Sequence, residues 1–463
     1  MKGELTDGPP LRRLVAFGLP LVVGTVAHGL FNLVDVWLVG RYAPSGEGAL
    51  PREASLAAIH ASSVLNFLPM LVANGLSVAT IAVVARSIGA GDGARAADDV
   101  NRSMIVTLLL GLVVGGIAGI TARAQIDALR VAPEAFDTAV RCLEVMSYGS
   151  VSMFALLQVT AIERAAGRSF PPLVLLTGAN VVNAVAAVLL VPRFGAVGAA
   201  WCTVLARGAF AVLGIAWLYG RQPEFRRWPG AFGTLVRECV RLVRLAIPAS
   251  LQIFSRALAV IFVTRFLAPV GGFREPVRAT TDVTAAYGVA LRLEMIAMFA
   301  CVGWGTAAAA AVGQNLGAGR VDRAIRMGWL GALIAAASMV VIGGALYFSA
   351  PKLFPFFLEE QDPDRLRSIV DYGTEYFRIL AFAYAFVGIG IVLAEAINGA
   401  GATRVSFLVD FLGYVVLLLG LALLFRKGHE RTGLWWALFA VHAVVAGTYA
   451  FLFARVLRAR ARA

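Results

Sequence analysis

Three polar side chains lie within the first long apolar run of the chain. His28, Asn32 and Asp35 are spaced i, i+4 and i+7, which places them on one face of a helix. A charged residue inside a membrane costs at least about 2.5–3.5 kcal/mol, so function is its first interpretation. Asp35 could take up and release a proton, or hold Na⁺ with neighbouring oxygens. The pattern predicts an ion-coupling group at Asp35; the alternative is a structural Asp that hydrogen-bonds to neighbouring spans.

Two further amides and one proline could serve the same chemistry. Asn180 and Asn183 lie in the fifth apolar run, where they could join the ion site or simply bond one helix to another. Pro20 removes one backbone hydrogen bond from the first run, which predicts a bend there. A bend that responds to the charge state of Asp35 would act as a gate, whereas the alternative is a static kink.

The second half of the chain carries a different set of charges within its apolar runs. Arg256, Arg292 and Glu294 are expected near the middle of the membrane. An ion pair between Arg256 and Glu294 would lower the cost of burying both charges, and we expect that pair. The alternative is that the arginines contact an anionic substrate.

The composition indicates that membrane helices position these groups. Hydrophobic residues make up 59% of the 463 residues, charged residues make up 15%, and the mean hydropathy is +0.78. A span needs about 20 apolar residues. Twelve apolar runs meet this requirement, and they predict an all-α membrane protein with spans near 14–40, 55–85, 103–121, 142–162, 172–191, 196–219, 242–268, 283–312, 327–348, 376–397, 405–425 and 434–457.

Short strings recur along the chain and divide these spans into two halves. Pro20 recurs as Pro248, and the string 89–91 (GAG) recurs at 317–319, both at an offset of 228 residues. The string 164–167 (RAAG) is matched by 398–401 (NGAG) at an offset of 234. Six spans in each half predict two parallel repeats. We expect an N-terminal lobe over 1–219, a cytoplasmic linker over 220–241 and a C-terminal lobe over 242–463.

Charge and motif content narrow the function. Basic residues concentrate in the segments on the side of the N-terminus, which predicts that both termini are cytoplasmic. The net charge of +13 then reflects topology and contact with anionic lipid rather than a nucleic-acid partner. No enzyme signature or phosphate loop occurs, so we expect neither an enzyme nor a cofactor. The four cysteines show no paired spacing and are interpreted as small apolar residues.

The chain resembles the multidrug and toxic compound extrusion (MATE) family, closest to its bacterial DNA-damage-inducible branch. The resemblance is carried by 31–40 (FNLVDVWLVG), 198–203 (GAAWCT), 312–319 (VGQNLGAG) and 398–401 (NGAG). It implies two lobes in a V, a monomer in the bacterial inner membrane, and export of organic, often cationic or amphipathic, compounds in exchange for H⁺ or Na⁺.

The resemblance also bears on single residues. Asp35 matches the family's first-helix aspartate, and Asn183 matches an asparagine that the family follows four residues later with Asp. Ala187 stands at that second position, so the choice between H⁺ and Na⁺ stays open. A flippase for a lipid-linked or anionic substrate is the alternative function, since related folds perform it and buried arginines would suit a pyrophosphate headgroup.

Overall fold

Long apolar runs become long helices throughout the part of the chain that the structure, a computed structural model, describes. That part comprises residues 3–42, 52–226, 232–267, 277–358, 362–426 and 432–462, with the backbone alone described for 32–42, 52, 232–235, 238, 265–266, 277–280 and 424–426. The helices are α1 (Pro10–Tyr42), α2 (Arg52–Gly89), α3 (Gly93–Ile120), α4 (Ala122–Ala128), α5 (Pro133–Tyr148), α6 (Ser150–Ala165), α7 (Phe170–Arg221), the 3₁₀ helix η1 (Pro223–Arg226), α8 (Phe232–Leu267), α9 (Val277–Gly317), α10 (Val321–Phe357), α11 (Pro363–Gly399), α12 (Thr403–Arg426) and α13 (Thr432–Arg462).

The longest helix, α7, is two antiparallel spans joined at Gly195. Its 52 residues are more than twice the length that crosses a bilayer. Gly195 has φ 58° and ψ −143°, a conformation that glycine adopts readily and other residues rarely do. Beyond this reversal Thr203 donates a hydrogen bond to Asn183 at 3.3 Å, so the two halves run side by side. The predicted spans 172–191 and 196–219 are these two halves.

The described helices account for twelve membrane spans, as the sequence predicts. Ten helices are long and apolar enough to cross a membrane, and α7 contributes two spans. The twelfth is the pair α5 and α6, which meet at Gly149 with a bend of 43°. The single span predicted over 142–162 is therefore a broken one that begins earlier, at Pro133.

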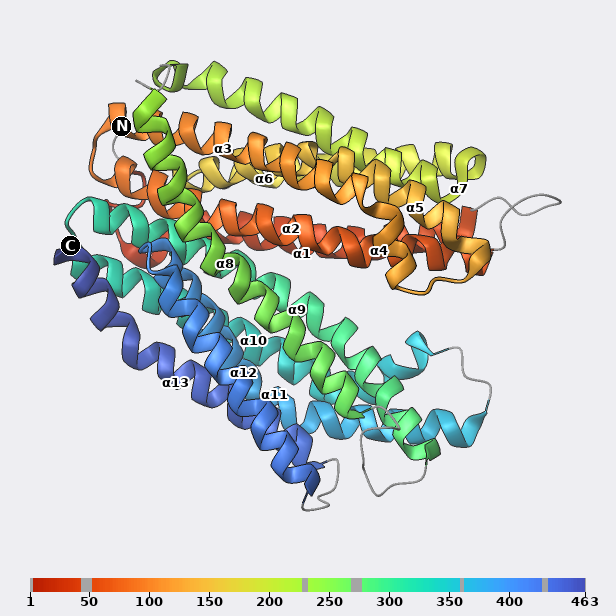
Figure 1. Cartoon of the computed structure of the whole chain (residues 1–463). Helices are drawn as coiled ribbons and strands as arrows, with labels where there is room; N and C mark the ends of the chain where they lie inside the picture. The colour runs from red at the N-terminus through yellow and green to blue at the C-terminus, as the bar shows by residue number, and fades with distance from the viewer. Residues whose placement is uncertain are drawn as a thin grey trace.

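Figure 1 shows the helices in two groups that converge at one end and diverge at the other. Helices α1–α7 form one group, and α8–α13 form the second. Both chain termini lie at the convergent end, as expected for an even number of spans (Figure 1). We call this the terminal end, and the opposite end the divergent end.

The backbone confirms the repeat seen in the sequence. Gly91 and Gly319 end the first turns of the two repeats with φ of 73° and 72°. Gly167 and Gly401, the other matched pair, have φ of 84° and 75°. Positive φ is costly for any residue with a Cβ, so glycine is required at each of these turns. Matched strings thus form matched turns.

The two halves meet at the terminal end through α2 and α9. A Cβ built on Gly89 would lie 2.0 Å from the carbonyl oxygen of Gln314, and one built on Gly317 would lie 2.0 Å from the carbonyl oxygen of Arg86. The contact is reciprocal, because residues 86 and 89 correspond to 314 and 317 at the offset of 228. The absence of side chains at both glycines lets the two backbones touch.

Candidate functional site

Helix α1, which carries most of the predicted ion-site residues, lies between the two halves. Thr25 on α1 donates a hydrogen bond to the carbonyl oxygen of Phe299 on α9 at 2.8 Å. On its other side, Gly24 packs against Leu173 of α7. The same helix is thus attached to both halves of the protein, which is the position that a moving element would need.

The structure brings together two of the five predicted ion-site residues. The Nδ2 of Asn180 on α7 lies 3.1 Å from Nδ1 of His28. An amide nitrogen can only donate, so this bond requires an unprotonated Nδ1 and places the imidazole proton on Nε2. The side chains of Asn32 and Asp35 lie outside the described residues, although both belong to the backbone of α1.

Asn183 and Pro20 take different places. Asn183 is buried and accepts its bond from Thr203 in the second half of α7, so it takes part in the packing of that hairpin. Pro20 lies inside α1, beside a small recess that is also lined by Arg164 of α6 and Thr306 of α9. The position of Pro20 within α1 is therefore known, and its role in gating stays a prediction.

A buried carboxylate organises the second half. Asp410 on α12 accepts bonds from Nε and Nη2 of Arg256 on α8 at 2.7 and 2.6 Å. It also accepts from Nε2 of Gln252 at 2.8 Å and from the hydroxyl of Tyr449 at 2.7 Å. The Asp410 side chain is only 3% exposed, and these donors satisfy both of its oxygens. The cluster ties α8, α12 and α13 together.

The predicted ion pair between Arg256 and Glu294 is wrong. Arg256 pairs with Asp410 because α8 packs along α12 and touches α9 only lightly. Glu294 on α9 instead accepts hydrogen bonds from the hydroxyls of Tyr376 and Tyr384 on α11, at 2.8 and 2.9 Å. Each of these half-buried groups has hydrogen-bond partners, but the partners lie on helices that are distant in the sequence.

Aromatic rings surround Glu294. Tyr376 lies edge-on to Trp435 with ring centroids 4.9 Å apart, and Tyr287 stacks on Trp435 at 5.9 Å. These rings are at most 4% exposed, whereas Glu294 itself is half-buried, so the carboxylate lies at the edge of this aromatic core. Arg292 lies two residues before Glu294 and is exposed. It therefore points away from this core, as the helical period requires.

Two further charges, both half-buried, continue the cluster toward the other half. Glu395 on α11 interacts electrostatically with Arg256 and with Arg164 on α6. Arg164 also donates to the backbone carbonyl and the hydroxyl of Thr160 at 3.0 Å. Positive and negative side chains thus alternate along this series, in the order Arg164, Glu395, Arg256 and Asp410. The sequence analysis names neither Arg164 nor Asp410 as a candidate site residue, although the burial cost of a charge inside a span could have drawn attention to Asp410.

Comparison with known proteins agrees with this architecture. The MatE family model matches residues 20–189 and 278–424. The probable multidrug resistance protein YpnP of Bacillus subtilis is 26% identical over 425 residues, covering 89% of this chain and 88% of its own. The probable multidrug resistance protein NorM of Deinococcus radiodurans is 25% identical over 443 residues, covering 93% of this chain and 92% of its own.

A solved structure, described as an outward-facing conformation of a multidrug resistance MATE family transporter, superposes with a TM-score of 0.87 at 20% identity over 100% of this chain and 99% of that one. With the family model matching more than half of its length, the chain belongs to the MatE family, the multidrug efflux transporters that its motifs indicate.

Proposed function

We propose that this protein exports organic compounds, cationic or amphipathic, in exchange for H⁺ or Na⁺. The observation that carries the proposal is the position of α1 between the halves, bonded to α9 through Thr25 and to α7 through His28. The names of the Bacillus and Deinococcus relatives, as probable multidrug resistance proteins, point to the same class of substrate.

The coupling residues lie on one face of α1. Asp35 follows His28 by seven residues, or two helical turns, so both belong to the face that meets Asn180 on α7. A proton or Na⁺ taken up by the Asp35 carboxylate removes or balances its charge. That change alters which surroundings α1 prefers, and α1 then shifts relative to α7 and α9, with Pro20 as the bending point.

The distribution of charge supports one orientation of the protein in the membrane. Arginines cluster at the terminal end, which by the positive-inside rule faces the cytoplasm. The divergent end then faces outward, so this conformation would release substrate and accept the coupling ion from outside. Opening at the terminal end would complete an alternating cycle.

The test is transport by purified protein in proteoliposomes under an imposed pH or Na⁺ gradient. A fluorescent cationic dye is the probe, and Asp35→Asn is compared with wild type. The matched control is Asp137→Asn, because Asp137 has a side chain that is 79% exposed and makes only a loose surface contact with Arg123. We expect gradient-driven dye export that Asp35→Asn abolishes and Asp137→Asn leaves intact.

Two results would count against the proposal. Export that persists in Asp35→Asn would remove this carboxylate from ion coupling. Failure of well-folded wild-type protein to move any cation under either gradient would favour the alternative, a flippase for a lipid-linked or anionic substrate. Protein that elutes as a single symmetric peak after reconstitution and re-extraction excludes misfolding as the reason.

A further inference from the structure

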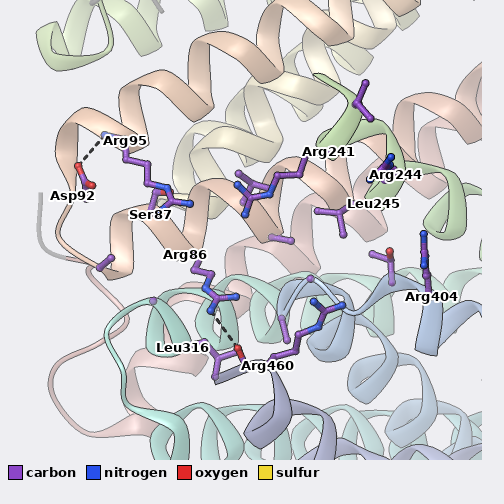
Figure 2. A pocket seen from close by; sticks show the side chains of 18 of the residues that line it. Arg86, Ser87, Asp92, Arg95, Arg241, Arg244, Leu245, Leu316, Arg404 and Arg460 are labelled. Atoms are coloured by element: carbon purple, nitrogen blue, oxygen red, sulfur yellow. Dashed lines mark hydrogen bonds between the residues drawn. The ribbon is translucent and has the colours of Figure 1, made fainter. Parts of the chain in front are cut away.

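A cavity of about 730 Å³ lies at the terminal end, between the two halves. Figure 2 shows arginine side chains entering it from several helices. The arginines that line it are Arg86 of α2, Arg95 of α3, Arg237, Arg241 and Arg244 of α8, Arg404 of α12 and Arg460 of α13. Five helices from both halves thus supply positive charge to one space.

The lining contains little negative charge to balance these arginines. Asp92 is the one acidic residue among the lining residues, and its carboxylate caps α3 by accepting from the backbone nitrogen of Arg95 at 2.9 Å (Figure 2). Within the part of the chain that the structure describes, no carboxylate forms an ion pair with Arg86, Arg244 or Arg404. The cavity therefore has an excess of cations.

These cations repel one another. The charges of Arg95, Arg241 and Arg460 all act unfavourably on the guanidinium of Arg86. Arg86 also donates to the backbone carbonyl of Arg460 at 3.2 Å, a bond that joins α2 to α13 across the two halves (Figure 2). A bound anion would turn this repulsion into attraction, because several guanidinium groups would share one negative partner.

The geometry points to a ligand that carries phosphate. We propose that this cavity binds a phosphate-bearing anion, supplied either by the headgroup of an anionic phospholipid or by a free phosphate compound. The guanidinium fork matches phosphate oxygens in bidentate fashion, and basic recesses between membrane helices suit anionic headgroups. Arg86 lies three residues before the end of α2 and Arg404 is the second residue of α12, so both lie near the ends of candidate spans, where the headgroups of a bilayer are expected.

Binding of this ligand would also depend on the conformation of the protein. A phosphate group held by Arg86 or Arg95 on one side and by Arg404 or Arg460 on the other requires the two halves to be together at the terminal end. Ligand binding to one of two conformations shifts the population toward it. Occupancy should therefore favour the conformation seen here and slow opening at the terminal end, whichever substrate is transported.

The test measures binding by purified protein in detergent, without transport, so that its outcome does not depend on the proposed function. Cardiolipin in mixed micelles and sodium pyrophosphate are titrated separately, with thermal stability and tryptophan fluorescence as readouts. Arg244→Gln/Arg404→Gln removes two cavity charges. Arg326→Gln/Arg458→Gln is the matched control, because both of these arginines are exposed at the same end and neither lines the cavity.

We expect the cavity variant to bind at least about ten-fold more weakly, while the control binds as wild type does. Arginine-dependent binding of cardiolipin alone identifies the lipid headgroup as the source. Arginine-dependent binding of pyrophosphate identifies a free phosphate compound. Equal affinity of wild type and both variants for each probe overturns the proposal, because binding would then follow overall charge or micelle contact rather than this cavity.

Discussion

The close contact of α2 with α9, formed by Gly89 against Gln314 and by Gly317 against Arg86, should control how often the terminal end opens. Replacing Gly317 with Ala adds one methyl group where the backbone of Arg86 already lies. The new Cβ would be 2.0 Å from a carbonyl oxygen, whereas ordinary contact begins at 3.4 Å. The two helices would have to move apart by about 1.4 Å, since neither partner is a flexible side chain.

The free-energy cost of this separation can be estimated. Overpacking of a well-packed contact costs about 1–3 kcal/mol. The cost applies only to the conformation in which α2 and α9 touch, so it lowers the population of that conformation by roughly 5- to 150-fold. Gly317→Ala should therefore shift the protein from the form seen here toward one that is open at the terminal end.

Electron–electron distance measurements between spin labels would show the shift, in a background without the four native cysteines. One label pair, at Ala94 on α3 and Arg458 on α13, reports on the terminal end. A second pair, at Glu134 on α5 and Phe356 on α10, reports on the divergent end. In Gly317→Ala we expect longer distances for the first pair and shorter distances for the second.

Gly116→Ala in α3 is the matched control, because a Cβ there meets nothing within 4 Å. It should leave both distance distributions unchanged. If Gly317→Ala folds with wild-type stability and also leaves both distributions unchanged, the contact does not hold the terminal end together, and the reasoning fails.

Four other substitutions test side-chain contacts within the spans. Asp410→Asn should lower the stability in detergent by about 1–3 kcal/mol, because it leaves the half-buried guanidinium of Arg256 without its charged partner. Adding Arg256→Gln should cost less than the sum of the single changes, and strict additivity in thermal denaturation would contradict the pair. Tyr384→Phe removes one of two donors to Glu294 and should cost about 1–3 kcal/mol in the same assay; no change would mean that water replaces the hydroxyl. Thr25→Val should cost about 0.5–1.5 kcal/mol and speed deuterium exchange in α1, and unchanged exchange would show that this bond does not hold the helix to α9.

Much of the architecture could be predicted from the sequence, because membrane spans are set by local composition. The run 283–312 lies within Val277–Gly317, and the glycine strings coincide with the turns that need positive φ. The bend between α5 and α6 was not predicted, since the apolar run continues through Gly149. At that residue a Cβ would lie 2.4 Å from Val204, so the close approach of α7 explains why glycine is present there.

The partners of the buried charges could not be predicted in the same way. Helical periodicity places Arg256 and Glu294 on particular faces, but it does not say which helix each face meets. Arg256 meets Asp410, which is 154 residues away in the sequence, and Glu294 meets hydroxyls 82 and 90 residues away. The sequence repeat predicts such partners better, because a contact between two helices of one half implies a contact between the equivalent two helices of the other half.

The repeat relates the bond of His28, which the proposed mechanism uses, to the ion pair of Arg256 in the second half. His28 and Arg256 correspond at the offset of 228, and each bonds from the first helix of its half to the fifth span, as His28 to Asn180 and Arg256 to Asp410. The first bond is neutral and contributes on the order of 1 kcal/mol, whereas a hydrogen bond to a charged group contributes about 1.5–3 kcal/mol. The side-chain bond that joins α8 to the fifth span of its half is therefore stronger than the one that joins α1 to the fifth span of its own. We therefore expect that, of these two helices, α1 moves during transport. Helix α1 carries Asp35, and its bond from His28 to Asn180 is weaker than the ion pair that Arg256 forms at the equivalent position of α8.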